Sequence, residues 1–148
     1  GPAPGAARGR ERGVSIHQVL TMASLVEGET RLPEERARVA GVYYNRLRRG
    51  MLLQADPTVQ YIIPDGPRRL LYRDLAINSP YNTYLYPGLP PGPVNNPGRD
   101  AIRAALYPES HDFYYFVADG HGGHVFTRNY AEHSRAVQRY RAMLRSRE

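Results

Sequence analysis

The sequence predicts an α+β domain that is mostly helical and carries one small antiparallel sheet. Helix-start signals followed by apolar residues at helical spacing recur along the chain. Two short β-prone runs, 113–117 and 124–127, flank a glycine-rich turn at 118–123, which is typical of a β-hairpin. The length of 148 residues fits one hydrophobic core, and the absence of cysteine means that packing rather than disulfides must stabilise it.

The first two helices are predicted from their ends. Ser15 and Gln18 have the spacing of a capping box, so a helix should start after Ser15 and run to about Gly28. Pro33, followed by two acidic residues, opens a second helix that ends in a basic turn before Gly50. The charges at both ends of this second helix suit its dipole.

Three further helices and one long loop complete the expected fold. Asp56-Pro57 should cap a short helix over 58–63, and Asn96-Pro97 should start another helix. A closing helix is expected over 129–144. The segment 79–97 is rich in Pro, Gly and Asn, which prevents regular structure, and ordered loops of this length usually carry function.

Composition excludes several function classes. The chain has no cysteine and all 20 of its basic residues are arginine, so a thiolate nucleophile, a lysine Schiff base and a P-loop lysine are impossible. No apolar run approaches the ~20 residues that a membrane span needs. The net charge of +6 comes from the two ends of the chain, because residues 14–127 hold as many acids as arginines. A nucleic-acid-binding groove through the body is therefore disfavoured.

Two acidic residues, Glu27 and Glu29, stand at the C-terminal end of the first predicted helix, where negative charge is unfavourable. On a helical wheel Glu27 falls in the apolar stripe, whereas Glu29 lies roughly 200° further round, beside Met22 and Val26. Enclosure of either carboxyl group would raise its pKa toward the range of a general acid. The alternative interpretation is a solvated helix end, or a carboxylate paired with Arg31.

Polar and aromatic side chains concentrate in the middle of the chain. Amides and short hydroxyls can hydrogen-bond sugar hydroxyls and acetamido groups, and tyrosine rings can stack on pyranose rings. The alternative interpretation is loop capping by Asn, Asp and Thr, with tyrosine as core filler. In the turn after residue 118, His121 and His124 offer two ligands for a metal but no third, which favours a hairpin turn over a metal site.

Several separated motifs occur in a fixed order along the chain. They are 23–30 (ASLVEGET), 44–47 (YNRL), 54–59 (QADPTV), 81–84 (YNTY), 88–92 (GLPPG), 96–98 (NPG) and 115–120 (YFVADG). In this series the chain resembles the endolytic murein transglycosylases of the MltG/YceG type, over nearly all of residues 14–144.

The resemblance implies a mostly helical, lysozyme-like catalytic domain that cleaves peptidoglycan glycan strands between N-acetylmuramic acid and N-acetylglucosamine. The product would carry a 1,6-anhydro muramyl end, formed by one Glu that acts first as general acid and then as base. The family motif places this acid at Glu29, before Thr30, whereas the helical wheel favours Glu27 as the more buried carboxyl. No metal or cofactor is implied. The positions expected to contact substrate are Asn45, Gln54, Asp56, Thr58, Tyr81, Asn82, Tyr84, Asn96 and His124.

The resemblance also predicts how the domain is used. Residues 1–13 have no apolar periodicity and are interpreted as a linker or an expression remnant, which leaves 14–148 as the catalytic domain. Full-length members of the resembled family carry a membrane helix and a LysM-like region before this domain. The expected location is therefore the cell envelope, at the outer (periplasmic) face of the cytoplasmic membrane, with peptidoglycan synthases (penicillin-binding proteins) as partners. The alternatives are a non-catalytic peptidoglycan-binding module and a nucleic-acid-binding domain that uses the terminal arginines.

Overall fold

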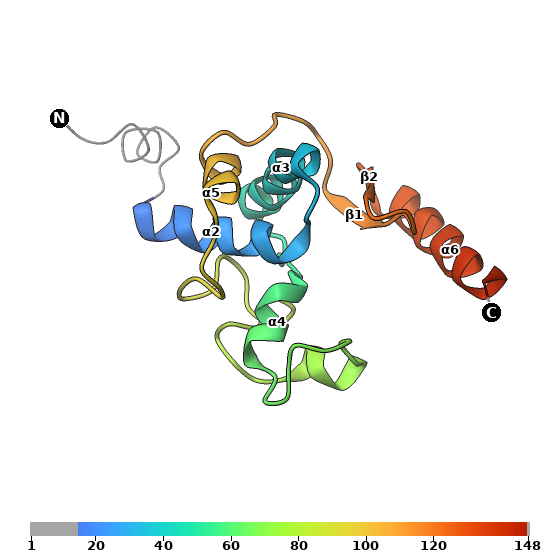
Figure 1. Ribbon diagram of the computed structural model, residues 1–148, viewed down its shortest axis with the longest axis horizontal. Helices are drawn as coiled ribbons and strands as arrows, with labels where there is room; N and C mark the ends of the chain where they lie inside the picture. Colours follow the sequence, from blue (N-terminus) through green and yellow to red (C-terminus); the bar gives the residue numbers. More distant parts are fainter. Residues whose placement is uncertain (1–14, 148) are drawn as a thin grey trace.

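Helices make up most of the computed structural model, which describes residues 15–147 (Figure 1). The elements in chain order are α2 (Ile16–Glu29), α3 (Pro33–Arg49), α4 (Asp56–Ile62), the 3₁₀ helix η1 (Tyr72–Ala76), α5 (Arg99–Leu106), β1 (Tyr115–Ala118), β2 (His124–Thr127) and α6 (Tyr130–Ser146). The predicted α+β class is confirmed. The predicted linker at 1–13 lies outside the described residues. No helix within 15–147 combines the length and the apolar character needed to cross a membrane.

The predicted ends of α2 and α3 are confirmed. The Ser15 Oγ accepts from the Gln18 backbone N–H at 3.1 Å, and the Gln18 side chain accepts from the Ser15 N–H at 2.8 Å. At the end of α3, Gly50 adopts a left-handed φ of 69° and donates to the Arg46 carbonyl. Glycine reaches this conformation without the steric cost that a Cβ would add.

The core lies where α2, α3 and α5 pack together (Figure 1). Its members are fully buried apolar side chains, chiefly Met22, Leu25, Val26, Val39, Tyr43, Leu53 and Ala105. Gly41 on α3 allows a close approach from the segment that follows α5. A Cβ built there would lie 2.5 Å from the Glu109 carbonyl oxygen and from His111 Nε2.

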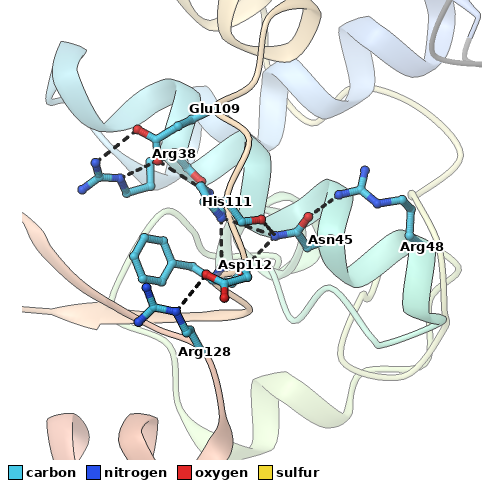
Figure 2. Close-up of polar contacts among 8 residues, drawn as sticks. Arg38, Asn45, Arg48, Glu109, His111, Asp112 and Arg128 are labelled. Atoms are coloured by element: carbon cyan, nitrogen blue, oxygen red, sulfur yellow. Dashed lines mark hydrogen bonds and ion pairs between the residues drawn. The ribbon is translucent and has the colours of Figure 1, made fainter.

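Side chains of α3 hold the segment between α5 and β1 in place (Figure 2). The Arg38 guanidinium forms a two-pronged ion pair with Glu109, at 2.8 and 3.1 Å. The His111 ring contacts the Arg38 carbonyl through Nε2 at 2.9 Å. Further along, Arg128 pairs with Asp112 at 2.8 Å. These contacts fix the position at which the chain enters the hairpin.

The hairpin pairs β1 with β2 in antiparallel register, with Tyr115 opposite Thr127 and Ala118 opposite His124. Asp119 shapes the turn, because its Oδ1 accepts from the backbone N–H groups of His121 and Gly123. The hairpin and α6 lie together at one end of the molecule, beside α3 and away from the start of α2 (Figure 1).

Several predicted boundaries are wrong by a few residues. Asp56 does not cap α4 with its side chain: Ala55 holds the cap position and Asp56 is the first helical residue. Helix α5 has Gly98 at its N-cap position, two residues beyond the predicted cap at Asn96. The first strand begins at Tyr115 rather than at 113, because the carbonyls of Phe113 and Tyr114 accept from side chains of α3. The helix η1 was not predicted.

Candidate active site

The Glu29 carboxyl group lies at the last turn of α2, against α3. The Tyr43 hydroxyl, which is buried, donates to Glu29 Oε2 at 3.0 Å. The pKa of Glu29 is raised from 4.5 to about 7, mainly because burial disfavours the charged form and secondarily because Asp56 is close. The hydrogen bond from Tyr43 opposes this rise in part. A carboxyl group in this state can both donate and accept a proton near neutral pH.

Glu29 lines a pocket of about 450 Å³, which we call the hairpin pocket. Three elements form its walls: the end of α2, the hairpin and α6. The lining residues are Glu29, Thr30, Arg31, Ala118, Gly120, Gly122, Gly123, His124, Tyr140 and Arg147. The acid with the raised pKa is therefore accessible from a concave surface, which is where ligand sites are usually found.

Glu35, near the start of α3, connects the pocket walls. Its carboxylate accepts from the His124 backbone N–H at 2.9 Å and contacts His124 Nδ1 at 2.7 Å. It also accepts from the Thr30 hydroxyl at 3.3 Å. Because a carboxylate only accepts, His124 Nδ1 carries the proton in this contact. Glu35 thereby joins the end of α2 to the first residue of β2.

A second, smaller pocket of about 210 Å³ lies beside Asp56, and we call it the η1 pocket. The Tyr84 hydroxyl donates to Asp56 Oδ1 at 2.5 Å. Burial raises the pKa of Tyr84 well above its ordinary value, so this hydroxyl keeps its proton. The lining residues are Asp56, Leu70, Leu71, Tyr72, Leu75 and Tyr84.

Glu27 has a different role from Glu29. Its Oε1 accepts from the Gly98 backbone N–H at 2.6 Å, which satisfies a free donor at the start of α5. The helical wheel favoured Glu27 as the more buried carboxyl, whereas the structure leaves both glutamates half-buried and burial raises the pKa of Glu29. Among the ion pairs of residues 15–147, neither glutamate pairs with Arg31.

The side chain of Asn45, predicted to contact substrate, is occupied inside the fold (Figure 2). Its amide nitrogen donates to the carbonyls of His111 and Phe113, both at 2.9 Å, and its oxygen accepts from Arg48. Asn45 is buried and holds the entry to the hairpin. These contacts favour a structural role for Asn45, and its sugar contact stays a prediction.

Thr58 and Asn82 are also buried and bond to backbone groups. The Thr58 hydroxyl donates to the Ala55 carbonyl at 2.7 Å. The Asn82 amide donates to the carbonyls of Leu75 and Ile77, at 3.0 and 2.9 Å. Both side chains hold loops next to the site, which favours a structural role for these two residues as well, and their substrate contacts stay predictions.

The remaining predicted contacts are distributed unevenly. Asp56, Tyr84 and His124 line the two pockets. The Tyr81 ring packs on Tyr61, with ring centroids 4.9 Å apart. The side chains of Gln54 and Asn96 are exposed, and Gln54 has a left-handed φ of 49°. The substrate contacts of these six residues stay predictions.

Sequence reasoning missed Tyr43, Glu35 and Tyr72. Tyr43 belonged to an apolar helical stripe, and Glu35 was explained by the helix dipole. For Tyr72, no local signal predicted η1. Within residues 15–147, no group of three or more His, Asp or Glu side chains is arranged to hold a metal ion.

The comparisons with known proteins agree with the resemblance seen in the motifs. The profile of the YceG-like family matches residues 4–139. The chain belongs to the YceG-like family. Two curated relatives are named endolytic murein transglycosylase: the one from Bacillus subtilis (strain 168) is 48% identical over 127 residues, and the one from Streptococcus pneumoniae (serotype 2, strain D39) is 40% identical over 134. Each alignment covers 86% of this chain.

A solved YceG-like structure shows the same fold. The crystal structure of a YceG-like protein from Listeria monocytogenes superposes with a TM-score of 0.80 at 41% identity, and covers 87% of this chain. This YceG-like chain spans only part of its relatives: 35% of the B. subtilis protein, 24% of the S. pneumoniae protein and 41% of the Listeria chain.

Proposed function

We propose that this YceG-like chain contains the catalytic domain, residues 14–148, of an endolytic lytic transglycosylase of peptidoglycan. The reaction is non-hydrolytic cleavage of the β-1,4 bond between N-acetylmuramic acid and N-acetylglucosamine. The names of the relatives support the reaction class. The observation that carries the assignment within this chain is the Glu29 carboxyl, whose pKa of about 7 lets it hold a proton where it lines the hairpin pocket.

Glu29 performs both proton transfers in this proposal. As general acid it donates its proton to the glycosidic oxygen, so the C1–O4 bond breaks and N-acetylglucosamine leaves with a free 4-hydroxyl. The resulting carboxylate then takes the proton from the muramyl C6 hydroxyl. The C6 oxygen bonds to C1, which closes the 1,6-anhydro ring and returns Glu29 to its protonated form.

Neighbouring groups support this cycle without a second catalytic carboxylate. Asp56 raises the pKa of Glu29, which keeps the acid protonated before cleavage. The Tyr43 hydroxyl donates to Glu29 Oε2, which stabilises the carboxylate after the proton has left. Tyr43 itself stays protonated, because burial raises its pKa.

A digest of purified peptidoglycan with wild type, Glu27→Gln and Glu29→Gln tests the proposal. We expect mass detection of 1,6-anhydro ends with wild type and with Glu27→Gln, because the amide oxygen that replaces the Glu27 carboxylate can still accept from the Gly98 N–H. Glu29→Gln should lose activity by roughly 10²–10⁴-fold while keeping its fold. If wild type binds glycan but releases no anhydro ends, the chain is a non-catalytic peptidoglycan-binding module. If Glu29→Gln retains near-normal turnover, Glu29 is not the acid.

The cellular context belongs to the same proposal. Peptidoglycan lies outside the cytoplasmic membrane, so a domain that cleaves it must work in the cell envelope, and the resemblance assigns it to the periplasmic face of that membrane. Peptidoglycan synthases make the glycan strands that the domain would cut, which makes them its proposed protein partners. Crosslinking of the full-length protein in cells, followed by mass spectrometry, tests this association.

A further inference from the structure

Two apolar side chains are displayed to solvent at the start of η1. Tyr72 is 86% exposed and the preceding Leu71 is 41% exposed. Both line the η1 pocket with Asp56 and Tyr84. Exposed apolar side chains that border a pocket with polar groups in it are a common feature of binding sites.

The backbone that carries these side chains is held firmly. Asp74 in η1 accepts from Arg68 at 2.7 and 3.0 Å, and also from the Leu71 backbone N–H at 2.7 Å. This ion pair lowers the pKa of Asp74 to about 2, so it persists at all physiological pH values. The Asn82 side-chain amide also donates to two carbonyls of this segment. The ion pair and these hydrogen bonds place Tyr72 on a preorganised element rather than on a loose loop.

Asp56 connects the η1 pocket with the candidate active site electrostatically. Asp56 lines this pocket and also lies close enough to Glu29 to raise its pKa. Glu29 in turn lines the hairpin pocket. A glycan strand bound at Glu29 therefore has two pockets available to it, one formed by the hairpin and the other by η1.

We propose that the η1 pocket is a sugar subsite, which binds an N-acetylhexosamine ring of the glycan strand next to the bond that is cut. The Tyr72 ring and Leu71 contact the apolar face of the sugar, and the Asp56 carboxylate accepts from a sugar hydroxyl. The inference rests on the proposed function. It explains how a strand interior is recognised, since an enzyme that cuts within a strand must bind sugars on both sides of the scissile bond.

Binding of chitobiose and chitohexaose, measured by titration calorimetry, tests the subsite. The measurement uses Glu29→Gln as the non-cleaving background, alone and combined with Tyr72→Ala or Leu71→Ser. We expect each double variant to weaken chitohexaose binding at least tenfold. Chitobiose binding should weaken less than chitohexaose binding, because the shorter ligand can bind at Glu29 without occupying the η1 pocket. Tyr130→Ala in the same background is the matched control, since Tyr130 is a 69% exposed tyrosine on α6 outside both pockets.

The outcomes separate the subsite from the proposed function. Unchanged chitohexaose affinity in Tyr72→Ala and Leu71→Ser overturns the subsite, even if wild type produces anhydro ends. Equal losses in these variants and in Tyr130→Ala also overturn it, because the effect is then not local. Selective loss of chitohexaose binding supports the subsite. If wild type then yields no anhydro ends, the subsite stands and the transglycosylase proposal fails.

Discussion

Replacing Glu29 with glutamine should stabilise the folded domain above neutral pH. The pKa of Glu29 is raised from 4.5 to about 7 in the folded chain, so the folded state binds this proton more tightly than the unfolded state does. The resulting penalty is absent below pH 4.5, grows as the pH rises from 4.5 to 7, and is complete above 7. Each pKa unit corresponds to about 1.4 kcal/mol, which makes the penalty about 3 kcal/mol.

Urea unfolding of wild type and Glu29→Gln at about pH 4, 6 and 8.5 measures this penalty. At the lowest pH both side chains are neutral and both can accept from Tyr43, so the free energies of unfolding should agree. At the highest pH the variant should be more stable by about 3 kcal/mol. Comparing the two proteins at each pH cancels the titration of all other groups.

The sign of the difference decides the result. A variant that is equally or less stable than wild type at high pH would show that the Glu29 carboxyl is not desolvated in the folded domain. The stability that the variant is expected to gain equals the stability that wild type loses by burying an ionised carboxylate. Such a loss is common for catalytic groups held in an unfavourable environment.

Three further predictions concern neighbouring side chains. Tyr43→Phe removes the hydrogen bond that lowers the pKa of Glu29, so the alkaline limb of the activity–pH profile should move up by about one unit; an unmoved or lowered limb contradicts this. In Glu35→Gln an amide N–H₂ replaces one of the two oxygens that accept from His124. Nitrogen-15 NMR should therefore show the imidazole proton moved from Nδ1 to Nε2, and kcat/KM should fall about tenfold. An unchanged tautomer refutes this. Asn45→Ala should lower the free energy of unfolding by about 2–3 kcal/mol but leave kcat/KM near normal below the melting temperature; a selective fall in kcat/KM would support the predicted sugar contact.

The parts of the fold that the sequence predicts well depend on local interactions. The capping box at Ser15 and the glycine after α3 bond within a few residues, so their spacing alone defines the helix ends. The hairpin is similar, because its glycine-rich turn and two β-prone runs are contiguous. The helix η1 is different: its position depends on the Arg68–Asp74 ion pair and the Asn82 amide, which no propensity rule describes.

The candidate site was harder to predict because burial changes the role of polar residues. Asn45, Thr58 and Asn82 have the groups that bind sugars, but the same groups satisfy buried carbonyls when the chain folds over them. The motif identified Glu29, whereas the wheel pointed to Glu27. Only the packing of α3 and α5 against α2 distinguishes their environments.

Digestion of peptidoglycan in water enriched with oxygen-18 tests the central claim most directly. If Glu29 transfers its proton to the leaving sugar and then activates the muramyl C6 hydroxyl, wild type should release 1,6-anhydro ends without oxygen-18. Glu29→Gln should release these ends at a rate lowered by roughly 10²–10⁴-fold. Reducing muramyl ends that carry oxygen-18 would instead show hydrolysis. Unlabelled anhydro ends released by Glu29→Gln at a near-normal rate would assign the chemistry to another residue.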